Sequence, residues 1–449
     1  MSGVFDLLIK NGTVVSGSGR KQCDIAIRRG KIVAVGSFQP ADAAEVIEAS
    51  HLHVLPGVID TQVHFREPGM EHKEDIESGT RAAVCGGVTT IFEMPNTKPA
   101  TTTAEALRDK LDRASGRAWC HYAFFVGACA ENIEQLDQLE QLPGTPGIKL
   151  FMGSSTGSLL VEQTDLVREV MKHGKRPMPV HSEDEARLRD RWHLVENGAH
   201  PREHFVWRDA ETARMNTERL LQLVHETRRP THVLHISTAE ELPLLKEAKR
   251  NRLPVTCEVT PNHLTFNEED YERIGSKVQM NPPVRTESTR LALWHAVKQG
   301  LFDVIGSDHA PHTEEEKAKP YPQSPSGMPG VQTLLPVMLD WFARGEIELE
   351  KVVQLTSENP AKLYQIKDKG FISPGMDADL VLVDLKGKQD VTRDWLESKC
   401  GWSPLEGRTL QGKITHTLVK GKAIVSDSTL VGEPSGEMVR FEGKDNELS

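Results

Sequence analysis

Between about residue 54 and residue 310 the chain repeats one pattern: a short apolar segment, a polar loop and a longer amphipathic stretch. Strands that alternate with helical segments pair into a parallel sheet, because each return crossover needs a helix. The segments that predict strands are residues 54–64, 88–94, 123–128, 148–152, 178–182, 232–237, 255–259 and 302–310. Eight such units predict an α/β protein with a (β/α)8 TIM barrel over residues 54–365.

The two ends of the chain have a different pattern, with short β-like segments separated by turns. Asn11-Gly12 and Arg29-Gly30 are predicted turns near the N-terminus, and Gly375 and Gly421 mark turns near the C-terminus. We expect residues 1–53 and 366–449, the latter including a polar tail, to pair into one small β-sandwich domain.

Composition narrows the class of protein. The formal net charge of −11 and the absence of a basic run argue against a nucleic-acid partner. No stretch reaches the roughly 18 apolar residues of a membrane span, and the N-terminus does not resemble a signal peptide. The six cysteines form no CxxC pair, as expected for reduced thiols. These features predict a cytoplasmic enzyme with a small-molecule substrate.

The ends of the predicted barrel strands carry residues suited to metal binding. Active sites of such barrels lie at the carboxyl ends of the strands. His64 closes the first strand, His181 the fifth and His235 the sixth, and Asp308 follows the eighth. Imidazole and carboxylate are ligands that zinc accepts. Each histidine alone could be structural, but their shared position at strand ends predicts a zinc site.

Lys149 lies in the fourth apolar segment, between Ile148 and Leu150. Burial there would lower its pKa, and the free amine could capture carbon dioxide as a carbamate, a carboxylate-like metal ligand. The alternative is a lysine that reaches solvent from the rim of the barrel.

Several motifs, in order, are similar to those of the dihydroorotase family of amidohydrolases. They are GVIDTQVHFREPG, EMPNTKP, MPVHSEDE, VLHISTAEEL, CEVTPNHL, NPPVR, GSDHAPH and the closing SPGMDADLVLVD, which together span almost the whole chain. The resemblance implies a (β/α)8 barrel with a terminal β-sandwich. It also implies a zinc centre and the reversible interconversion of N-carbamoyl-L-aspartate and dihydroorotate in pyrimidine biosynthesis.

Carried over by position, the resemblance assigns roles to individual residues. The implied metal ligands are His64, carboxylated Lys149, His181, His235 and Asp308, and the implied substrate contacts are Arg66, Asn96, Asn281, His312, Ser326 and Gly327. Asp308 is also the expected catalytic residue, moving the proton between water and the ring nitrogen. An arginine fork at position 66 suits the carboxylate of dihydroorotate.

These substrate contacts have simpler alternatives. Arg66 could form a surface ion pair with Glu67. Asn96 and Asn281 could be turn formers. His312 could cap a helix that begins at Thr313.

The chain departs from the family pattern at position 62, where Gln62 replaces the first histidine of an H-x-H pair. An amide oxygen is a weaker zinc ligand than imidazole, so the number of zinc ions, one or two, stays open. A second departure, Asn262, puts any further metal pocket near Glu258 and His263 in question.

Two other classes of function remain possible. An allantoinase or hydantoinase would share the barrel and its metals, although an uncharged ring has no use for Arg66. A non-catalytic, dihydroorotase-like structural partner of another pyrimidine enzyme would bind no metal and show no activity. We expect a homodimer, the commonest assembly of such enzymes.

Overall fold

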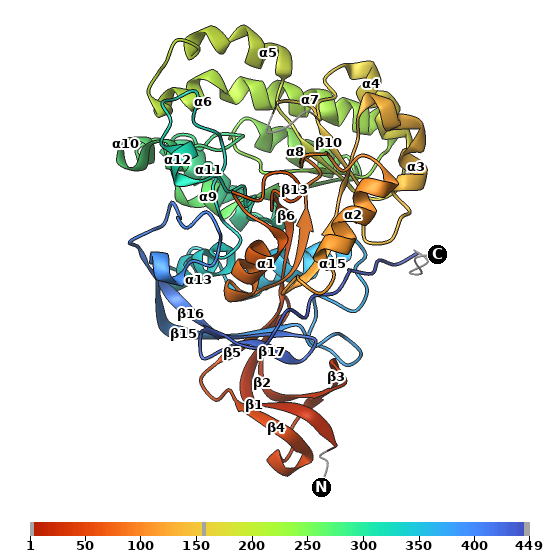
Figure 1. Ribbon diagram of the computed structural model, residues 1–449, viewed down its shortest axis with the longest axis vertical. Helices are drawn as coiled ribbons and strands as arrows, with labels where there is room; N and C mark the ends of the chain where they lie inside the picture. The colour runs from red at the N-terminus through yellow and green to blue at the C-terminus, as the bar shows by residue number, and fades with distance from the viewer. Residues whose placement is uncertain (1–3, 155–158, 444–449) are drawn as a thin grey trace.

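The computed structural model describes residues 4–154 and 159–443. A parallel barrel forms one part, and a sheet built from both ends of the chain lies against one end of it (Figure 1). The predicted fold class is confirmed: a (β/α)8 barrel with a small β-sandwich formed by the N- and C-terminal segments. The predicted polar tail, residues 444–449, lies outside the described residues.

The barrel wall consists of parallel strands in a three-stranded and a six-stranded sheet. The strands are β6 (Val58–Val63), β7 (Val88–Glu93), β8 (His121–Phe124), β9 (Val126–Gly127), β10 (Ile148–Phe151), β11 (Met178–His181), β12 (Thr231–Val233), β13 (Val255–Val259) and β14 (Val304–Ile305). Because β8 and β9 are two parts of one predicted strand, each of the eight predicted strands has its counterpart. The backbone N–H of His64 donates to the carbonyl oxygen of His309 (2.7 Å), which joins the last strand to the first.

Helices cover the outside of the barrel. They are α1 (Ile76–Cys85), α2 (Ala104–Ala114), α3 (Leu136–Leu139), α4 (Thr164–Lys172), α5 (Glu185–Asp190), α6 (His204–Trp207), α7 (Ala210–Thr227), α8 (Glu241–Arg250), α9 (Pro261–Thr265), α10 (Asp270–Ile274), α11 (Glu287–Lys298), α12 (Glu314–Lys317), α13 (Leu334–Ala343), α14 (Leu349–Val353) and α15 (Asn359–Leu363). Each helix is expected to bury one apolar face against the barrel. In α4 that face consists of Val167, Val170 and Met171, which are spaced as on one side of a helix. Asp209 caps α7 by accepting from the backbone N–H of Thr212.

The terminal sheet joins strands from both ends of the chain. These are β1 (Phe5–Ser16), β2 (Gly19–Arg28), β3 (Lys31–Gly36), β4 (Ala43–Glu48), β5 (His53–Pro56), β15 (Leu380–Asp390), β16 (Thr409–Val419), β17 (Lys422–Ser426) and β18 (Thr429–Leu430). The junction is the antiparallel pair β5 and β15, with Val54 opposite Leu382. In Figure 1 the N-terminal strands in red and the C-terminal strands in blue lie side by side at the bottom. The exact limits between the units stay predictions.

One predicted turn is confirmed and another is wrong. Arg29 and Gly30 both have positive φ, 51° and 74°, and join β2 to β3. Asn11 and Gly12 instead lie inside β1, where the register with β2 shifts. The strand continues because β4 pairs with its first half and β5 with its second, so a reversal there would break the sheet.

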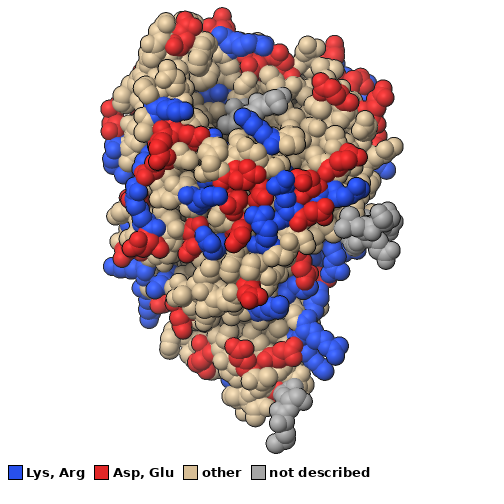
Figure 2. Space-filling model, in the orientation of Figure 1, with Lys and Arg blue, Asp and Glu red and all other residues tan. Residues whose placement is uncertain are grey.

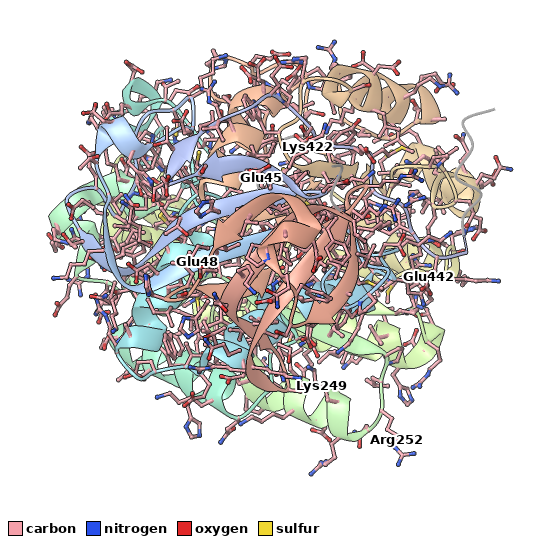
Figure 3. All side chains as sticks on the ribbon, turned by 90° about the horizontal axis from the view of Figure 1, so that it is seen from below. Glu45, Glu48, Lys249, Arg252, Lys422 and Glu442 are labelled. Carbon is pink, nitrogen blue, oxygen red and sulfur yellow. The ribbon has the colours of Figure 1, made fainter. Side chains whose placement is uncertain are left out.

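The orientation of the barrel follows from chain continuity. Strand β5 belongs to the terminal sheet, and β6 begins two residues later, so β6 runs away from that sheet. All barrel strands are parallel, so their carboxyl ends lie at the end of the barrel remote from the sandwich. Figure 3 looks from the sandwich end, where Glu45 and Glu48 of β4 lie in front of the barrel.

The visible surface carries both signs of charge. In Figure 2, lysine and arginine side chains are interspersed with aspartate and glutamate rather than gathered in one large basic area. In the part of the chain that the structure describes, no helix combines the length and apolar character that a membrane crossing needs.

Candidate active site

The five predicted metal ligands lie where barrel strands end. Lys149 is in β10 and His181 is the last residue of β11, while His64, His235 and Asp308 directly follow or lie just beyond β6, β12 and β14. All five side chains are buried. The tertiary structure therefore gathers residues that are far apart in the sequence at one end of the barrel.

The backbone is unusual at three of the strand ends. Arg66, His235 and Asp308 have positive φ values of 66°, 36° and 49°. Few non-glycine residues adopt this region, and such conformations cluster at functional sites, where the surrounding structure maintains them. The positive φ turns these side chains out of the regular strand alternation.

His181 and His235 form the first pair of candidate ligands. Nδ1 of His181 lies 3.1 Å from Nε2 of His235, and Nε2 of His181 donates to Oε2 of Glu183 at 2.8 Å. A carboxylate has no proton to donate, so the proton of His181 is on Nε2 and the lone pair of Nδ1 faces His235. Burial lowers the pKa of His181 and places that of His235 well below its usual range, which favours neutral imidazoles.

His64 and Asp308 form the second pair, with Nε2 of His64 at 3.3 Å from Oδ1 of Asp308. Nδ1 of His64 is hydrogen-bonded to Oδ1 of Asn96 at 2.8 Å. The amide nitrogen of Gln62 donates to Oδ1 of Asp308 at 3.0 Å, and Oε1 of Gln62 is buried without a hydrogen-bond partner. Burial and then the neighbouring Glu258 carboxylate raise the pKa of Asp308 to about 7.

Lys149 lies close to both pairs. Its side chain is 1 % exposed, so the alternative of a lysine reaching solvent is wrong. Burial lowers its pKa to about 7, against the attraction of Asp308 and Glu258. After burial, the Lys149 charge is also among the groups that lower the pKa values of His64, His181 and His235. An amine with this pKa is partly uncharged near neutral pH, as carbamate formation requires.

The donor set fits zinc if Lys149 supplies an oxygen. Among the described residues, no three His, Cys, Asp or Glu side chains form a metal site by themselves. Catalytic zinc needs about three protein ligands, and two ligand atoms at tetrahedral positions lie about 3.3 Å apart. The His181–His235 separation is close to that value, and a carbamate on Lys149 would supply the third donor. The assignment of metal ligands stays a prediction.

Arg66 and His312 meet at the rim of the site. Arg66 is 2 % exposed and donates from Nε to the carbonyl oxygen of Pro311. The predicted alternative of a surface ion pair with Glu67 is wrong, because Glu67 is buried and paired with Arg117.

His312 has polar contacts at both ring nitrogens. Nδ1 lies 3.0 Å from Nζ of Lys73, and Nε2 lies 3.0 Å from the carbonyl oxygen of Ser326. Burial and Arg66 lower the pKa of His312 to about 3, which keeps the ring neutral. The alternative that His312 caps a helix is wrong, since Thr313 caps α12 with its own hydroxyl.

The other predicted substrate contacts lie on adjoining loops. His204 links two of them, with Nε2 at 2.9 Å from Oδ1 of Asn281 and 3.4 Å from Oγ of Ser326. Gly327 has a φ of 143°, and a Cβ there would lie 2.3 Å from the carbonyl oxygen of Ala310, so only glycine fits. Their contact with a substrate stays a prediction.

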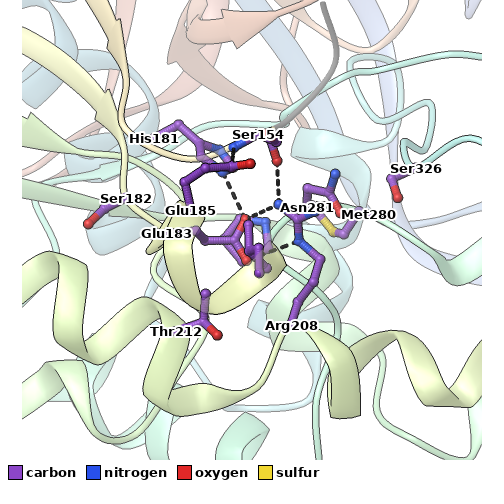
Figure 4. Close-up of polar contacts among 12 residues, drawn as sticks. Ser154, His181, Ser182, Glu183, Glu185, Arg208, Thr212, Met280, Asn281 and Ser326 are labelled. Atoms are coloured by element: carbon purple, nitrogen blue, oxygen red, sulfur yellow. Dashed lines mark hydrogen bonds and ion pairs between the residues drawn. The ribbon is translucent and has the colours of Figure 1, made fainter. Parts of the chain in front are cut away.

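Sequence reasoning missed Glu183 and Arg208. Arg208 donates from Nε to Oε1 and from Nη2 to Oε2 of Glu183, at 3.1 and 2.6 Å, and also to the carbonyl oxygen of Ser154 (Figure 4). Burial alone would raise the pKa of Glu183, but Arg208 and His181 hold it well below its usual range. Glu183 belongs to a quoted motif, whereas nothing in the sequence near Arg208 indicates a site.

Comparison with known proteins defines the class. The model of the amidohydrolase family matches residues 53–424, so the chain belongs to the amidohydrolase family and is a hydrolase. A dihydroorotase of Methanosarcina acetivorans is 34% identical and aligns over 98% of this chain and 97% of its own length. An allantoinase of Rubrobacter xylanophilus is also 34% identical, over 97% of this chain and 98% of that protein.

Solved structures agree with the barrel and sandwich. An L-hydantoinase (dihydropyrimidinase) from Arthrobacter aurescens superimposes with a TM-score of 0.92 at 28% identity, covering 97% of this chain and 99% of that one. A D-hydantoinase superimposes with a TM-score of 0.89 at 27% identity, covering 96% of this chain and 98% of that one. The predicted resemblance to dihydroorotases is confirmed. The dihydroorotase and the allantoinase are equally identical to the chain, so sequence identity does not distinguish between their substrates.

Proposed function

We propose that the chain is a dihydroorotase, which interconverts N-carbamoyl-L-aspartate and dihydroorotate. The observation that carries the proposal is the environment of Arg66. Its guanidinium is buried and feels the charge of the candidate metal ligand Asp308, but forms no ion pair with an Asp or Glu among the described residues. A buried arginine without a protein carboxylate is suited to an anionic ligand, and both compounds carry a carboxylate.

Neighbouring groups support the same choice. Lys73 contacts Nδ1 of His312 and forms an ion pair with Glu316 (3.1 Å), which together hold the His312 ring in place. His312 and Arg66 are in contact, with Nη2 of Arg66 at 3.3 Å from Nε2 of His312, so both would face one bound ring. Asn96 would add hydrogen bonds to the ring from the loop after β7.

Zinc is the proposed cofactor, one or two ions per chain, held by His181, His235, Lys149 as a carbamate, His64 and Asp308. When bound, zinc would polarise the amide carbonyl and lower the pKa of a water molecule. The support from this chain is the pair of facing imidazole nitrogens and the lysine whose pKa is about 7.

Asp308 is the proposed proton carrier. In hydrolysis it would take a proton from the attacking water and deliver it to the leaving ring nitrogen, and ring closure would reverse both transfers. A pKa of about 7 suits this role, because the group can accept and release a proton near neutral pH. Gln62 holds the carboxylate in place through Oδ1.

The test measures how fast the protein hydrolyses dihydroorotate, allantoin and hydantoin. We expect preference for dihydroorotate, together with cyclisation of carbamoyl-aspartate. Faster hydrolysis of allantoin or hydantoin would refute the proposal, and the Rubrobacter relative makes allantoin the more informative of the two. Absence of both metal and turnover would identify a non-catalytic partner.

A second test addresses Asp308. Asp308→Asn should lower turnover by at least about 100-fold while zinc stays largely bound. Turnover close to that of the unmodified protein would show that another group moves the proton.

The cellular setting is also a proposal. All six cysteines lie in the described part of the chain and are unpaired, the state expected in the reducing cytoplasm. The expected homodimer would be checked by light scattering.

A further inference from the structure

We propose that Glu183, clamped by Arg208, is a positioning residue that fixes the tautomer of His181 and thereby prepares its Nδ1 for a metal ion. The inference rests on the proposed metal centre but assigns a role to two residues outside the predicted ligand set. It concerns the ring of His181 before any metal binds, so it is testable without catalysis.

The first step is the hydrogen bond between Glu183 and His181. Oε2 of Glu183 lies 2.8 Å from Nε2 of His181, and both side chains are almost fully buried. The carboxylate can only accept, so the imidazole proton is held on Nε2. The lone pair of Nδ1 then faces Nε2 of His235 at 3.1 Å.

The second step is the arginine clamp. Two guanidinium nitrogens of Arg208 contact the two oxygens of Glu183, and both side chains are at most 3 % exposed. A bidentate pair fixes the plane of the carboxylate as well as its charge. The direction in which Glu183 presents Oε2 to His181 is therefore set by Arg208.

The third step is that Arg208 joins two strand ends and, through Arg285, a third. Its Nη2 donates to the carbonyl oxygen of Ser154, which follows β10 and Lys149. Its own carbonyl oxygen accepts from Nη1 of Arg285 (2.8 Å), and Nε of Arg285 lies 3.3 Å from Oγ of Ser237, just after β12 and His235. The Arg208 side chain thus connects the segments that carry Lys149 and His181, and Arg285 extends the network to the segment of His235.

The rings of His64 and His181 are held differently. Nδ1 of His64 meets a neutral amide oxygen of Asn96, whereas His181 meets a charged carboxylate. A carboxylate bonded to a ligating imidazole raises the basicity of the ligand nitrogen, and loss of such a partner typically weakens metal binding about 10- to 100-fold.

The experiment measures the tautomer of His181 and the affinity for Zn²⁺ in the full chain stripped of metal. ¹⁵N-histidine NMR, with His181→Gln to assign the signal, reports which ring nitrogen is protonated, and competition with a chelator reports zinc affinity. We expect a single Nε2–H tautomer in the unmodified protein. Glu183→Gln should give a mixture of tautomers and about 10- to 100-fold weaker zinc binding, because an amide can either donate or accept.

A matched control is Glu185→Gln. Glu185 is buried two residues away and accepts from the backbone N–H of Ser154 at 2.7 Å, without a contact to His181 among the described residues. It should leave the tautomer unchanged and zinc affinity within about twofold. Arg208→Lys, which keeps the charge but loses the fork, should give an intermediate effect.

Glu183→Gln leaves Arg208 buried without its carboxylate, so it could fail to fold. The double variant Glu183→Gln/Arg208→Gln removes both charges and should show the same mixture of tautomers. The proposal is overturned if either variant keeps the single Nε2–H tautomer with unchanged zinc affinity, or if Glu185→Gln loses as much affinity as Glu183→Gln. Failure to turn over dihydroorotate would refute the proposed function and leave the tautomer result standing.

Discussion

The side-chain amide of Gln62 donates a hydrogen bond to Oδ1 of Asp308 across 3.0 Å, and the same oxygen lies 3.3 Å from Nε2 of His64. The amide nitrogen cannot bind a cation, and the amide oxygen of Gln62 is a weaker zinc ligand than an imidazole at position 62 would be. The pair is therefore expected to hold a metal more weakly than His181 and His235.

The first prediction follows from this contact. Gln62→His should raise the zinc retained after dialysis from about one to about two ions per chain, because imidazole is a better zinc ligand than an amide. Elemental analysis measures the ratio. Gln22→His, on exposed β2, is the control for the added histidine. Two ions in the unmodified protein would contradict the prediction.

A second prediction concerns carboxylate recognition. Arg66→Met should lower kcat/KM for dihydroorotate about 10- to 100-fold, because this is the typical effect of losing hydrogen bonds to a charged group. Arg66→Lys should recover part of the loss, since it keeps the charge without the fork. Steady-state kinetics with dihydroorotate and with hydantoin separate the cases. An equal loss on hydantoin, which has no carboxylate, would mean that Arg66 acts on the site as a whole.

A third prediction uses the proton equilibrium of Lys149. Only the uncharged amine captures carbon dioxide, and its pKa is about 7, so the carbamate should be lost as pH falls below that value. Activity in buffer freed of carbon dioxide should decline below about pH 7 and recover when bicarbonate is added. Lys149→Ala should lose zinc and regain some activity with a small added carboxylate. Retention of full zinc by Lys149→Ala would show that no carbamate is needed.

A fourth prediction concerns stability at the base of the barrel. Asp379 is buried between Nζ of Lys369 (2.6 Å) and Nε2 of His121 (3.2 Å), and so joins the C-terminal segment to β8. Burial alone would raise its pKa, but Lys369 and His121 hold it well below its usual range. Such a group stabilises the fold at pH values above its unfolded pKa of about 3.9, and this stability is lost as pH falls further.

Asp379→Asn should accordingly lower the free energy of unfolding by about 3 kcal/mol at neutral pH. The difference should shrink once the pH falls below about 4. Urea unfolding of both proteins at the two pH values measures it, with Asp390→Asn at the exposed end of β15 as control. A difference that is constant with pH would show that packing, rather than charge, is responsible.

Much of the fold could be predicted because its signals are local. The alternation of apolar segments and amphipathic stretches placed every barrel strand, and the β-rich ends were correctly expected to pair. The Asn11-Gly12 turn was wrong for a non-local reason, since two partner strands keep β1 extended through that dipeptide.

The candidate site also has one part that local sequence predicts and another part that depends on distant segments. Position at a strand end singled out His64, His181, His235 and Asp308, because the end of a buried strand is recognisable from neighbouring residues alone. The burial of Arg66, which rejected its pairing with Glu67, depends on segments some 245 positions away.

The sequence by itself determined the barrel, the strand ends and the residue types at them, because short-range periodicity fixes which side chains leave each strand and where. Only the tertiary structure decided how those side chains are held. Gln62 meets Asp308 across 246 positions of sequence, and Arg208 reaches Glu183 from a loop before α7. Hydrogen bonds and ion pairs act over a few ångströms, so partners far apart in the chain are known only once the fold has brought them together.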